Sequence, residues 1–522
     1  MRESLSTLCA NTPDPPVPSL LVAGTSSGAG KTSTTLALLC ALEARGIEAA
    51  AAKCGPDYID AGFLTAMTGR AAPNLDVWMS RVGGVRVAAS GCGADRERFW
   101  RREGTLPTGL ARLFARLCAT ADMVVAEGAM ALYDGADGGV GSAAHLAVLL
   151  RLPVLLVISA ASLGQSVGAL AEGFLCHHPS WLPPDGPKPV FAGIVCSHVG
   201  REKHRDMLRA ALSDVEERLH VPLLGLLPRE GAPQLASRHL GLVQAEETEL
   251  DSGALADWFE ANCDLDLLLE RIGFGPKRSG RASAMEARPA SVVRRKPAYR
   301  ACPAAGIRVG IARDAAFSFC YADLPDLLVE FGARCVFFSP LADAAPPSCD
   351  ALYFPGGYPE LHAGALAANT AMLSALRRVA ARGTPVYGEC GGYMYLMRSL
   401  RSSGVEYVMS GLLPLDCEMD GKWAALGYRA VRALPDGAGR GGLWARGHEF
   451  HYGRIVGMRP LECACSPLWR VYDSRGEDLG EEGCRKGNVS GSWVHLYPEG
   501  ARAFWKLWLA GVARGLNDIF AC

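Results

Sequence analysis

Short apolar runs alternate with longer amphipathic stretches through the first half of the chain. We expect buried parallel strands at residues 20–23, 47–53, 123–126, 154–158 and 191–196. The continuous apolar character of these runs is typical of strands that are covered on both faces, and the stretches between them suit helices. This alternation predicts a doubly wound sheet that binds its ligands at the carboxyl ends of the strands.

The second half of the chain has an α/β pattern of its own. Strands are expected at 307–312, 335–338, 351–354 and 384–387, antiparallel strands at 405–413 and 423–433, and a helix around 501–515. We therefore predict the α/β fold class with two doubly wound domains, at residues 18–270 and 305–522.

A basic stretch separates the two patterns. Residues 273–300 carry eight lysines and arginines, Glu286 as their only acid, and few large apolar side chains. Such a composition cannot pack a core, so residues 271–304 are predicted to form a flexible basic linker. A contact for an acidic ligand is the alternative. Residues 81–109, which are charged and Gly-rich, are expected to form an irregular surface insertion.

Composition narrows the class of protein. The chain of 522 residues is too long for one ordinary core, and its net charge of −1 argues against a general binder of nucleic acids or membrane surfaces. The polar first 19 residues lack the apolar core of a signal peptide, and no apolar run could span a bilayer. The 18 cysteines are scattered without a C-x-x-C pair, which indicates reduced thiols. We expect a cytoplasmic protein.

Residues 20–39, LLVAGTSSGAGKTSTTLALL, combine an apolar strand, a Gly-rich loop and the start of a helix. Backbone N–H groups around Gly28 and Gly30 can surround phosphate oxygens. Lys31 can reach the β- and γ-phosphates, and the Thr32 hydroxyl can hold Mg²⁺. The spacing differs from G-x-x-x-x-G-K-[ST], because a threonine stands where the first glycine would be. We predict ATP with Mg²⁺ as the ligand, and a plain Gly-rich turn is the alternative.

Acidic residues follow two of the predicted strands, at the same sheet edge as the Gly-rich loop. They lie in KCGPDYID (53–60) and EGAMALYDG (127–135). Asp57 and Glu127 are the predicted Mg²⁺ ligands together with Thr32, because Mg²⁺ takes carboxylates, phosphate oxygens and water. Asp60 and Asp134 are predicted to orient a substrate carboxylate or the transferring phosphoryl group. Helix capping or a turn is the alternative, above all for Asp134, which precedes a glycine.

One cysteine has a setting that suits catalysis. Residues 384–393, TPVYGECGGY, predict a strand, a sharp turn of small residues and the start of a helix, with Cys390 at the turn. This is the arrangement of a nucleophile elbow, and the helix N-terminus is expected to lower the pKa of the thiol. Amides near Gly357, which follows another strand, and near Gly391 are predicted to stabilise an oxyanion.

A cysteine nucleophile also requires a general base. Two stretches offer histidines for this role: SWVHLY (492–497), which contains His495, and RGHEFH (446–451). The H-E-x-H spacing of the second stretch differs from the zinc motif H-E-x-x-H, so it does not predict a metal site. The residues alone leave the pairing with Cys390 open.

Taken together, these stretches resemble the cobyrinic acid a,c-diamide synthase family of cobalamin biosynthesis. The matching stretches are GTSSGAGKT (24–32), KCGPDYIDAGF (53–63), NLDVWM (74–79), EGAMALYDG (127–135), SRHLGL (237–242), ARDAAFSF (312–319), FFSPLAD (337–343), GGYPELHA (356–363), GECGGYMYL (388–396), GHEFHYG (447–453) and SWVHLY (492–497). Many motifs in one order are more specific than any single motif. In this family a dethiobiotin synthetase-like P-loop ATPase domain is fused to a triad-type class I glutamine amidotransferase domain.

The resemblance implies an amide synthase that depends on ATP and glutamine. Cys390 would attack glutamine, and His495 is favoured as the base because its position matches the family motif. ATP would activate the a and c acetate carboxylates of cobyrinic acid for attack by ammonia. The expected partners are a corrinoid and glutamine, with no nucleic acid or membrane and with a homodimer as one possible assembly. Hydrogenobyrinic acid, which lacks cobalt, and Ni-sirohydrochlorin are the alternative substrates.

Some positions depart from the family pattern. Ser197 replaces a frequent Asn, and Tyr497 stands where triad amidotransferases usually have an acid or a His. The third member of the triad therefore stays open. A rival of another class is a P-loop ATPase switch protein, which would have no use for Cys390 in an elbow. A glutaminase fused to a degenerate ATPase is disfavoured by the intact Lys31 and Thr32.

Overall fold

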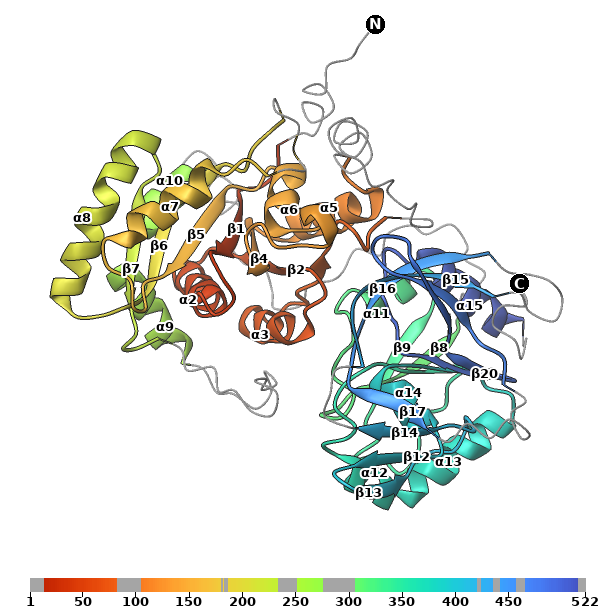
Figure 1. Ribbon diagram of the computed structural model, residues 1–522. Coiled ribbons are helices and arrows are strands. Elements are labelled where there is room, and N and C mark those ends of the chain that lie inside the picture. The colour runs from red at the N-terminus through yellow and green to blue at the C-terminus, as the bar shows by residue number, and fades with distance from the viewer. Residues whose placement is uncertain are drawn as a thin grey trace, which may run out of the picture. The chain divides into compact units, whose positions relative to one another are not determined.

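The computed structural model describes residues 14–81, 105–179, 182, 186–232, 251–275, 306–419, 424–434, 442–456 and 465–514 (Figure 1). Internal contacts divide the chain into two compact units. The first comprises Met1–Trp78 and Ser90–Pro297, and the second Met79–Ala89 and Ala298–Cys522. Most of the predicted linker and most of the predicted surface insertion lie outside the described residues.

A seven-stranded sheet forms the centre of the first unit. From edge to edge, its strands are β3 (Asn74–Leu75), β2 (Ala49–Cys54), β4 (Met123–Ala131), β1 (Ser19–Gly24), β5 (Val154–Ser159), β6 (Phe191–Val199) and β7 (Leu223–Pro228). Every neighbouring pair runs parallel. The strands are largely apolar because helices cover both of their faces.

Two groups of helices build the cores on either side of this sheet, as Figure 1 shows. One core contains α5 (Thr108–Thr120), α6 (Ala143–Leu150), α7 (Ser166–Cys176) and α8 (Glu202–Leu219). The other contains α2 (Lys31–Ala44), α3 (Tyr58–Thr68), α9 (Ser252–Asn262) and α10 (Leu265–Arg271). Successive residues of β1 alternate between them, with Leu21 in the first core and Leu20 and Val22 in the second. The first unit is therefore doubly wound.

A six-stranded sheet forms the centre of the second unit. Its order is β20 (Cys484–Lys486), β21 (Val489–Ser492), β11 (Val386–Glu389), β10 (Ala351–Phe354), β8 (Arg308–Ala312) and β9 (Arg334–Phe338). Only the β20–β21 pair is antiparallel within this described sheet. The unit's helices are α11 (Leu324–Glu330), α12 (Ala363–Ala368), α13 (Thr370–Ala381), α14 (Gly391–Leu396) and α15 (Arg502–Ala513).

Two smaller sheets extend the second unit. One has the order β13 (Val405–Val408), β12 (Ser399–Ser402), β14 (Asp416–Met419) and β17 (Gly453–Val456). The other has the order β19 (Asp478–Glu482), β18 (Trp469–Tyr472), β15 (Ala425–Ala433), β16 (Trp444–His451) and β22 (His495–Leu496). Only Trp493 and Val494 separate β21 from β22, so the chain passes directly from the central sheet to this smaller one.

The predicted α/β class with two doubly wound domains is confirmed. Each apolar run that predicted a central strand overlaps one in the structure. Strands β3 and β7 were not predicted. Strand β3 has only two residues, and a Gly and a Pro interrupt the apolar pattern of β7. Within the part of the chain that the structure describes, no helix combines the length and apolarity needed to cross a membrane.

Two glycines of α7 give a matched test of helix packing. A Cβ at Gly168 would lie 2.6 Å from the carbonyl oxygen of Ala211 on α8, whereas a Cβ at Gly173 would meet nothing within 4 Å. We expect Gly168→Ala to lower the free energy of unfolding of the first unit by about 1–3 kcal/mol through overpacking. Gly173→Ala should raise it by about 0.5–1 kcal/mol, because Ala favours the helix. Equal effects of the two variants in urea denaturation would contradict this packing.

Candidate functional site

The Gly-rich loop connects β1 to α2 in the first unit. Gly28 and Gly30 have φ angles of 73° and 85°, in the left-handed region that glycine enters without strain. Gly30 directly precedes α2, and no side chain caps this helix, so the free N–H groups of its first turn adjoin the loop. A Cβ at Gly24 would lie 3.0 Å from Cγ of Lys31. Gly24 therefore leaves room for the Lys31 side chain. This accounts for a glycine at position 24, one residue before the position that the standard motif gives to its first glycine.

Lys31 bends back over this loop. Its Nζ donates a hydrogen bond to the carbonyl oxygen of Ser26 at 3.0 Å. Burial and the nearby charge of Lys53 lower the pKa of Lys31. The ammonium group thus lies beside the backbone that is predicted to surround phosphate, and its contact with phosphate stays a prediction.

The end of β6 supports the loop from another side. Ser197 Oγ donates to the carbonyl oxygen of Ala29 at 2.7 Å, and a Cβ at Gly30 would lie 3.0 Å from the Ser197 Cβ. Ser197 is the position at which the resembling family often has Asn. Serine therefore retains a direct hydrogen bond to the loop at this position.

Glu127 connects the loop helix to the neighbouring strand. One carboxylate oxygen, Oε1, accepts a hydrogen bond from Thr32 Oγ1 at 2.7 Å and one from Lys53 Nζ at 2.7 Å. The other oxygen, Oε2, is buried and has no hydrogen-bond partner among the described residues. Burial raises the pKa of Glu127 to about 7, although Lys53 acts in the opposite direction. The structure thus brings together Thr32 and Glu127, two of the three predicted metal ligands.

Lys53 is a functional candidate that the sequence prediction missed. It is the penultimate residue of the alanine-rich strand β2, is 1% exposed, and lies directly opposite Glu127 in the register of β2 and β4. Its ammonium also pairs with Asp60 and lies 3.8 Å from Asp57. Burial alone would lower the Lys53 pKa, but the three carboxylates outweigh it and raise the pKa. The available sequence signal was a lysine near the end of an apolar run, a few residues before two acids.

The remaining predicted acids have local hydrogen bonds. Asp57 caps α3, where its Oδ1 accepts from the N–H groups of Ile59 and Asp60 at 3.0 Å each. Asp134 is exposed, and its side chain accepts from the N–H of Ala131 at 3.3 Å in a turn. Both contacts match the capping and turn alternatives. The metal and substrate roles of these two acids stay predictions.

The donor set suits a cation that also takes oxygens from a nucleotide. The buried free oxygen of Glu127 and the hydroxyl of Thr32 supply hard oxygen ligands beside the loop. Among the residues described, no group of three or more His, Cys, Asp or Glu side chains has an arrangement that could hold a metal alone. Mg²⁺, which commonly takes one or two carboxylates and completes its shell with phosphate and water, fits this arrangement.

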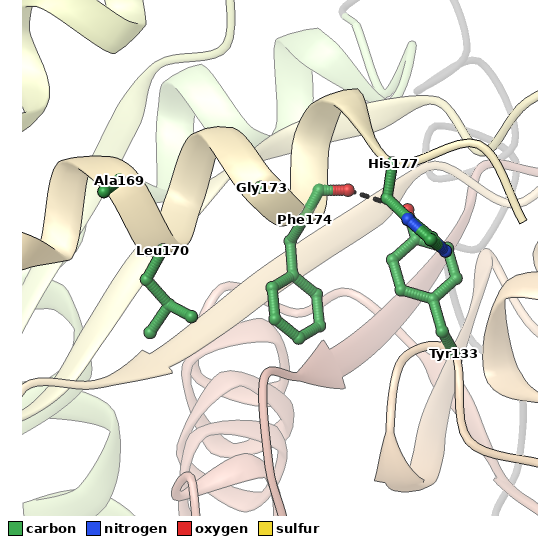
Figure 2. Close-up of a pocket in the computed structure, with 6 residues that line it drawn as sticks. All are labelled: Tyr133, Ala169, Leu170, Gly173, Phe174 and His177. Atoms are coloured by element: carbon green, nitrogen blue, oxygen red, sulfur yellow. Dashed lines mark hydrogen bonds between the residues drawn. The ribbon is translucent and has the colours of Figure 1, made fainter.

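A shallow cavity of about 310 Å³ lies beside the turn that carries Asp134 (Figure 2). Tyr133 borders it and donates a hydrogen bond to the carbonyl oxygen of Phe174 at 2.7 Å, and His177 meets the tyrosine ring edge-on. The other lining residues come from α7 and are mainly apolar. None of the predicted site residues lines this cavity.

In the second unit, Cys390 occupies a sharp turn between β11 and α14. Its φ and ψ are 47° and −106°, a strained conformation for a residue with a side chain. The turn is tight because its glycines meet neighbouring backbone: a Cβ at Gly392 would overlap the carbonyl oxygen of Phe354. The N–H of Cys390 donates to the carbonyl oxygen of Ser492 at 2.8 Å. The predicted elbow is present.

The two glycines predicted for the oxyanion site lie beside each other. A Cβ at Gly391 would lie 2.9 Å from the nitrogen of Gly357. Gly357 itself has a φ of 156°, and a Cβ there would overlap the carbonyl oxygen of Ala316. Both positions require glycine, because backbone segments from different strands approach each other at this point.

His495 packs against the same loop. A Cβ at Gly356 would overlap the Cε1 of the His495 ring, so the imidazole packs directly on this glycine. Strand β22 pairs with β16, with His495 directly opposite His448. Through the contacts of the Gly356–Gly357 loop, the structure gathers His495, Gly391 and Cys390 at one place. The Cys390 sulfur also lies 3.8 Å from the carbonyl oxygen of Phe450.

Burial is the main influence on the pKa values of Cys390 and His495. Burial, with a smaller contribution from Glu360, raises the pKa of the Cys390 thiol, and the hydrogen bond from the Gly391 N–H only partly offsets this. The expectation that the helix N-terminus would give a lowered pKa is therefore wrong, because it ignored the loss of solvent. Burial also lowers the pKa of His495 well below its usual value, with His448 acting in the same direction.

The ring of His448 packs against His495, and a buried tyrosine occupies position 497. The His448 ring stacks on the His495 ring with centroids 4.9 Å apart and an interplanar angle of 12°. Tyr497 is fully buried and meets the Tyr321 ring edge-on at 5.2 Å. Glu389 accepts from the Tyr353 hydroxyl and from the N–H of Leu496, so each of its two oxygens has a hydrogen-bond donor. These neighbours come from long-range strand pairing, which the local sequence pattern does not indicate.

Comparison with known proteins matches both units. A family model described as a CobQ/CobB/MinD/ParA nucleotide binding domain matches residues 20–243, and one described as a CobB/CobQ-like glutamine amidotransferase domain matches residues 308–503. Hydrogenobyrinate a,c-diamide synthase of Brucella abortus is 42% identical, covering 91% of this chain and 97% of that protein. The protein of the same name in Rhodobacter capsulatus is 40% identical, covering 91% and 98%.

A likeness among solved structures is weaker. A chain in the structure of PurLQS from Thermotoga maritima is 18% identical, with a TM-score of 0.27, and the match covers 38% of this chain and 96% of that one. This similarity is too low to support an argument about fold or function.

The free oxygen of Glu127 gives a test of the cation site. We expect Glu127→Gln to weaken the Mg²⁺-dependent part of ATP binding by at least about tenfold, because an amide is a poorer ligand for a hard cation than a carboxylate. ATP binding without Mg²⁺ should be retained. The measurement is calorimetric titration with ATP, with and without Mg²⁺, with the exposed Glu217→Gln on α8 as a control. An equal gain from Mg²⁺ in the Glu127 variant and the control would contradict the assignment.

Proposed function

The chain belongs to the cobyrinic acid a,c-diamide synthase family, and on this basis we propose that it converts the a and c acetate carboxylates of a corrin ring to amides. It is a ligase of cobalamin biosynthesis that takes its amide nitrogen from glutamine. The main support is that one chain carries both a Gly-rich loop beside a buried carboxylate and a cysteine elbow beside a buried histidine. The first arrangement can activate a carboxylate, and the second can release ammonia.

In the second unit, Cys390 is the proposed nucleophile. Its sulfur attacks the carboxamide carbon of glutamine while His495 accepts the thiol proton. The N–H groups near Gly357 and Gly391 stabilise the negative oxygen of the tetrahedral intermediate. When the carbon–nitrogen bond breaks, His495 returns the proton to the departing nitrogen, which leaves as ammonia. Water then hydrolyses the glutamyl thioester to glutamate and restores the thiol.

The burial of this pair favours a reaction that starts from neutral groups. A raised thiol pKa and a lowered imidazole pKa keep both Cys390 and His495 uncharged before glutamine binds. Proton transfer to His495 therefore accompanies the attack on glutamine and does not precede it. The negative charge then develops on the oxygen beside Gly357 and Gly391, where the backbone N–H groups are proposed to stabilise it.

In the first unit, the γ-phosphoryl group of ATP moves to a corrin carboxylate. The product is an acyl phosphate, from which ammonia displaces inorganic phosphate to leave the amide. Gly28, Gly30 and Lys31 hold the phosphates, and Lys53 adds a fixed positive charge to the same region. Asp60 and Asp134 orient the acceptor carboxylate or the transferring group.

Thr32 and Glu127 are the proposed protein ligands of Mg²⁺, with Asp57 as a further ligand. When bound there, the ion would neutralise charge on the phosphate oxygens during transfer. The free oxygen of Glu127 supports this assignment more directly than the geometry of Asp57, whose Oδ1 already caps α3.

The proposed substrate is hydrogenobyrinate, the corrin without cobalt. The relatives at 38–42% identity carry this substrate in their names, and the matches cover 91% of the present chain. Cobyrinate, which the family resemblance implied, is the competing substrate for the same two amidations. Residue chemistry alone supports only an activated carboxylate and ammonia from glutamine.

Mass spectrometry of the reaction products tests this proposal. The full chain is incubated with ATP, Mg²⁺ and glutamine, and with either hydrogenobyrinate or cobyrinate. We expect hydrogenobyrinate to undergo two successive mass changes, each equal to the exchange of OH for NH₂, and at a higher kcat/KM than cobyrinate. Preference for cobyrinate would overturn the substrate assignment. Absence of amidation on either corrin, with glutaminase activity present, would overturn the proposed function and direct attention to Ni-sirohydrochlorin.

Replacement of the nucleophile separates the two halves of the reaction. We expect Cys390→Ser to lower glutamine-dependent amidation by roughly 10³-fold or more, because the attacking sulfur is lost. Amidation with ammonium salts should continue near the wild-type rate, since the first unit is untouched. Cys335→Ser, on the edge strand β9, is the matched control and should retain both activities. Loss of amidation from both nitrogen sources in Cys390→Ser would remove Cys390 from its assigned role.

A further inference from the structure

His198 lies near the Gly-rich loop of the first unit and has no role in the chemistry described so far. It is the penultimate residue of β6 and is half-buried. Its φ angle is 54°, in the left-handed region that residues with a side chain seldom enter. The pairing of β6 with β7 shifts register between Cys196 and Val199, so His198 lies at an irregularity of the sheet. Irregularities of this kind redirect side chains beside active sites.

The redirected side chain packs against the loop. A Cβ at Gly30 would lie 3.6 Å from Cε1 of the His198 ring. The preceding residue, Ser197, donates a hydrogen bond to the carbonyl oxygen of Ala29 at 2.7 Å. Two consecutive residues of β6 therefore lie against the loop, whereas successive side chains of a regular strand point to opposite faces. Strain of the kind that His198 carries is concentrated at functional sites.

Two serine hydroxyls hold one nitrogen of this ring. Nδ1 of His198 lies 3.1 Å from Oγ of Ser159 and 3.2 Å from Oγ of Ser197. Because the single proton of the Ser197 hydroxyl goes to a backbone carbonyl oxygen, Oγ of Ser197 can only accept from the ring. The ring proton therefore belongs on Nδ1, where both serine oxygens can accept it. In a neutral imidazole the other nitrogen, Nε2, then carries no proton and can only accept a hydrogen bond.

The surroundings of His198 favour this neutral form. Burial, with the nearby charge of Arg229, lowers the pKa of His198 below its ordinary value. Within the part of the chain that the structure describes, Nε2 has no hydrogen-bond partner. An ionised phosphate oxygen cannot be its partner, because both atoms would be acceptors. The partner must be a donor, such as a hydroxyl or an amino group.

A nucleotide in the Gly-rich loop offers such donors in its nucleoside part. They are the two ribose hydroxyls and, in ATP, the 6-amino group of the base. The ribose is joined directly to the phosphates, and the base is one group further away. Because the loop holds the phosphates, a side chain that packs against the loop itself reaches the ribose before the base.

We propose that Nε2 of His198 accepts a hydrogen bond from a ribose hydroxyl of ATP, so that His198 selects ribonucleotides over deoxyribonucleotides. This inference rests on the proposed function, because it takes ATP as the ligand of the Gly-rich loop. Ser159 and Ser197 are positioning residues, since they fix the plane of the ring and the place of its proton. The contact recognises the sugar, whereas the contacts of the loop with phosphate are common to all nucleoside triphosphates.

Calorimetric titration of the full chain tests this contact, with Mg²⁺ and with ATP, 2′-deoxyATP, 3′-deoxyATP or ITP. We expect the wild-type chain to bind one of the two deoxy nucleotides roughly 3- to 10-fold more weakly than ATP, the effect of one lost hydrogen bond. In His198→Ala, ATP should bind as weakly as that deoxy nucleotide. ITP, in which a carbonyl oxygen replaces the 6-amino group, should keep the same affinity ratio to ATP in both chains.

Two further variants separate this contact from a general effect on the loop. His198→Asn keeps a residue that tolerates a left-handed backbone and a nitrogen near the position of Nδ1, but it lacks Nε2. It should therefore also lose the discrimination, and it carries the test if His198→Ala does not fold. The matched control is His220→Ala, because His220 has the same φ angle of 54° but is exposed at the C-terminus of α8. It should bind all four nucleotides like the wild type.

Two results would overturn the inference. One is equal affinity of the wild-type chain for ATP and both deoxy nucleotides, and the other is a deoxy penalty that persists unchanged in His198→Ala and His198→Asn. A change in the ITP ratio alone would place the contact at the base and would also refute the ribose assignment. Failure of the proposed function appears in a separate measurement, as absence of corrin amidation even when ammonium salts supply the nitrogen.

Discussion

The buried ammonium of Lys53 is the interaction on which the first site depends. Transfer of such a charge from water to the end of an alanine strand costs several kcal/mol unless carboxylates neutralise it. Glu127 supplies one carboxylate from the adjacent strand, and Asp60 supplies another from the first turn of α3. Because Glu127 also accepts from Thr32, the helix that follows the Gly-rich loop is tied to the same cation. The Lys53 ammonium therefore links two strands and two helices, one of which follows the Gly-rich loop.

The second site depends on close approach of backbone segments. Gly357 and Gly391 meet without room for a side chain, and Gly356 receives the ring of His495 in the same way. Cys390 remains in a conformation that costs about 1–3 kcal/mol because the strands and glycines around it allow no other path for the chain. Burial of the surrounding core offsets this strain. A larger residue at any of these glycines would displace Cys390 or His495, the proposed nucleophile and base.

The sequence predicted those parts of the structure that local pattern controls. Short apolar runs identified the central strands, and clusters of small residues identified the Gly-rich loop and the Cys390 elbow. Each of these signals is contained in a few neighbouring residues. The pattern could not identify His448 as a neighbour of His495, since strands far apart in sequence bring them together. Lys53 was overlooked for the same reason, because its role depends on Glu127 across the sheet. The prediction of a lowered pKa for the Cys390 thiol was wrong, because burial outweighs the effect of the helix N-terminus. Burial depends on the tertiary structure, which a local sequence pattern does not reveal.

The two proposed sites require opposite electrostatic environments. Phosphoryl transfer concentrates negative charge, so the first site gathers Lys31 and Lys53 with carboxylates that hold them in place. Release of ammonia requires the reverse, because a strongly charged site would favour ammonium, which is not a nucleophile. Burial keeps Cys390, His495 and His448 uncharged, and only the transient oxyanion calls for stabilisation. A single core could hardly provide both environments. Two units, each with its own sheet, allow charge to be concentrated in one and excluded from the other within a single chain.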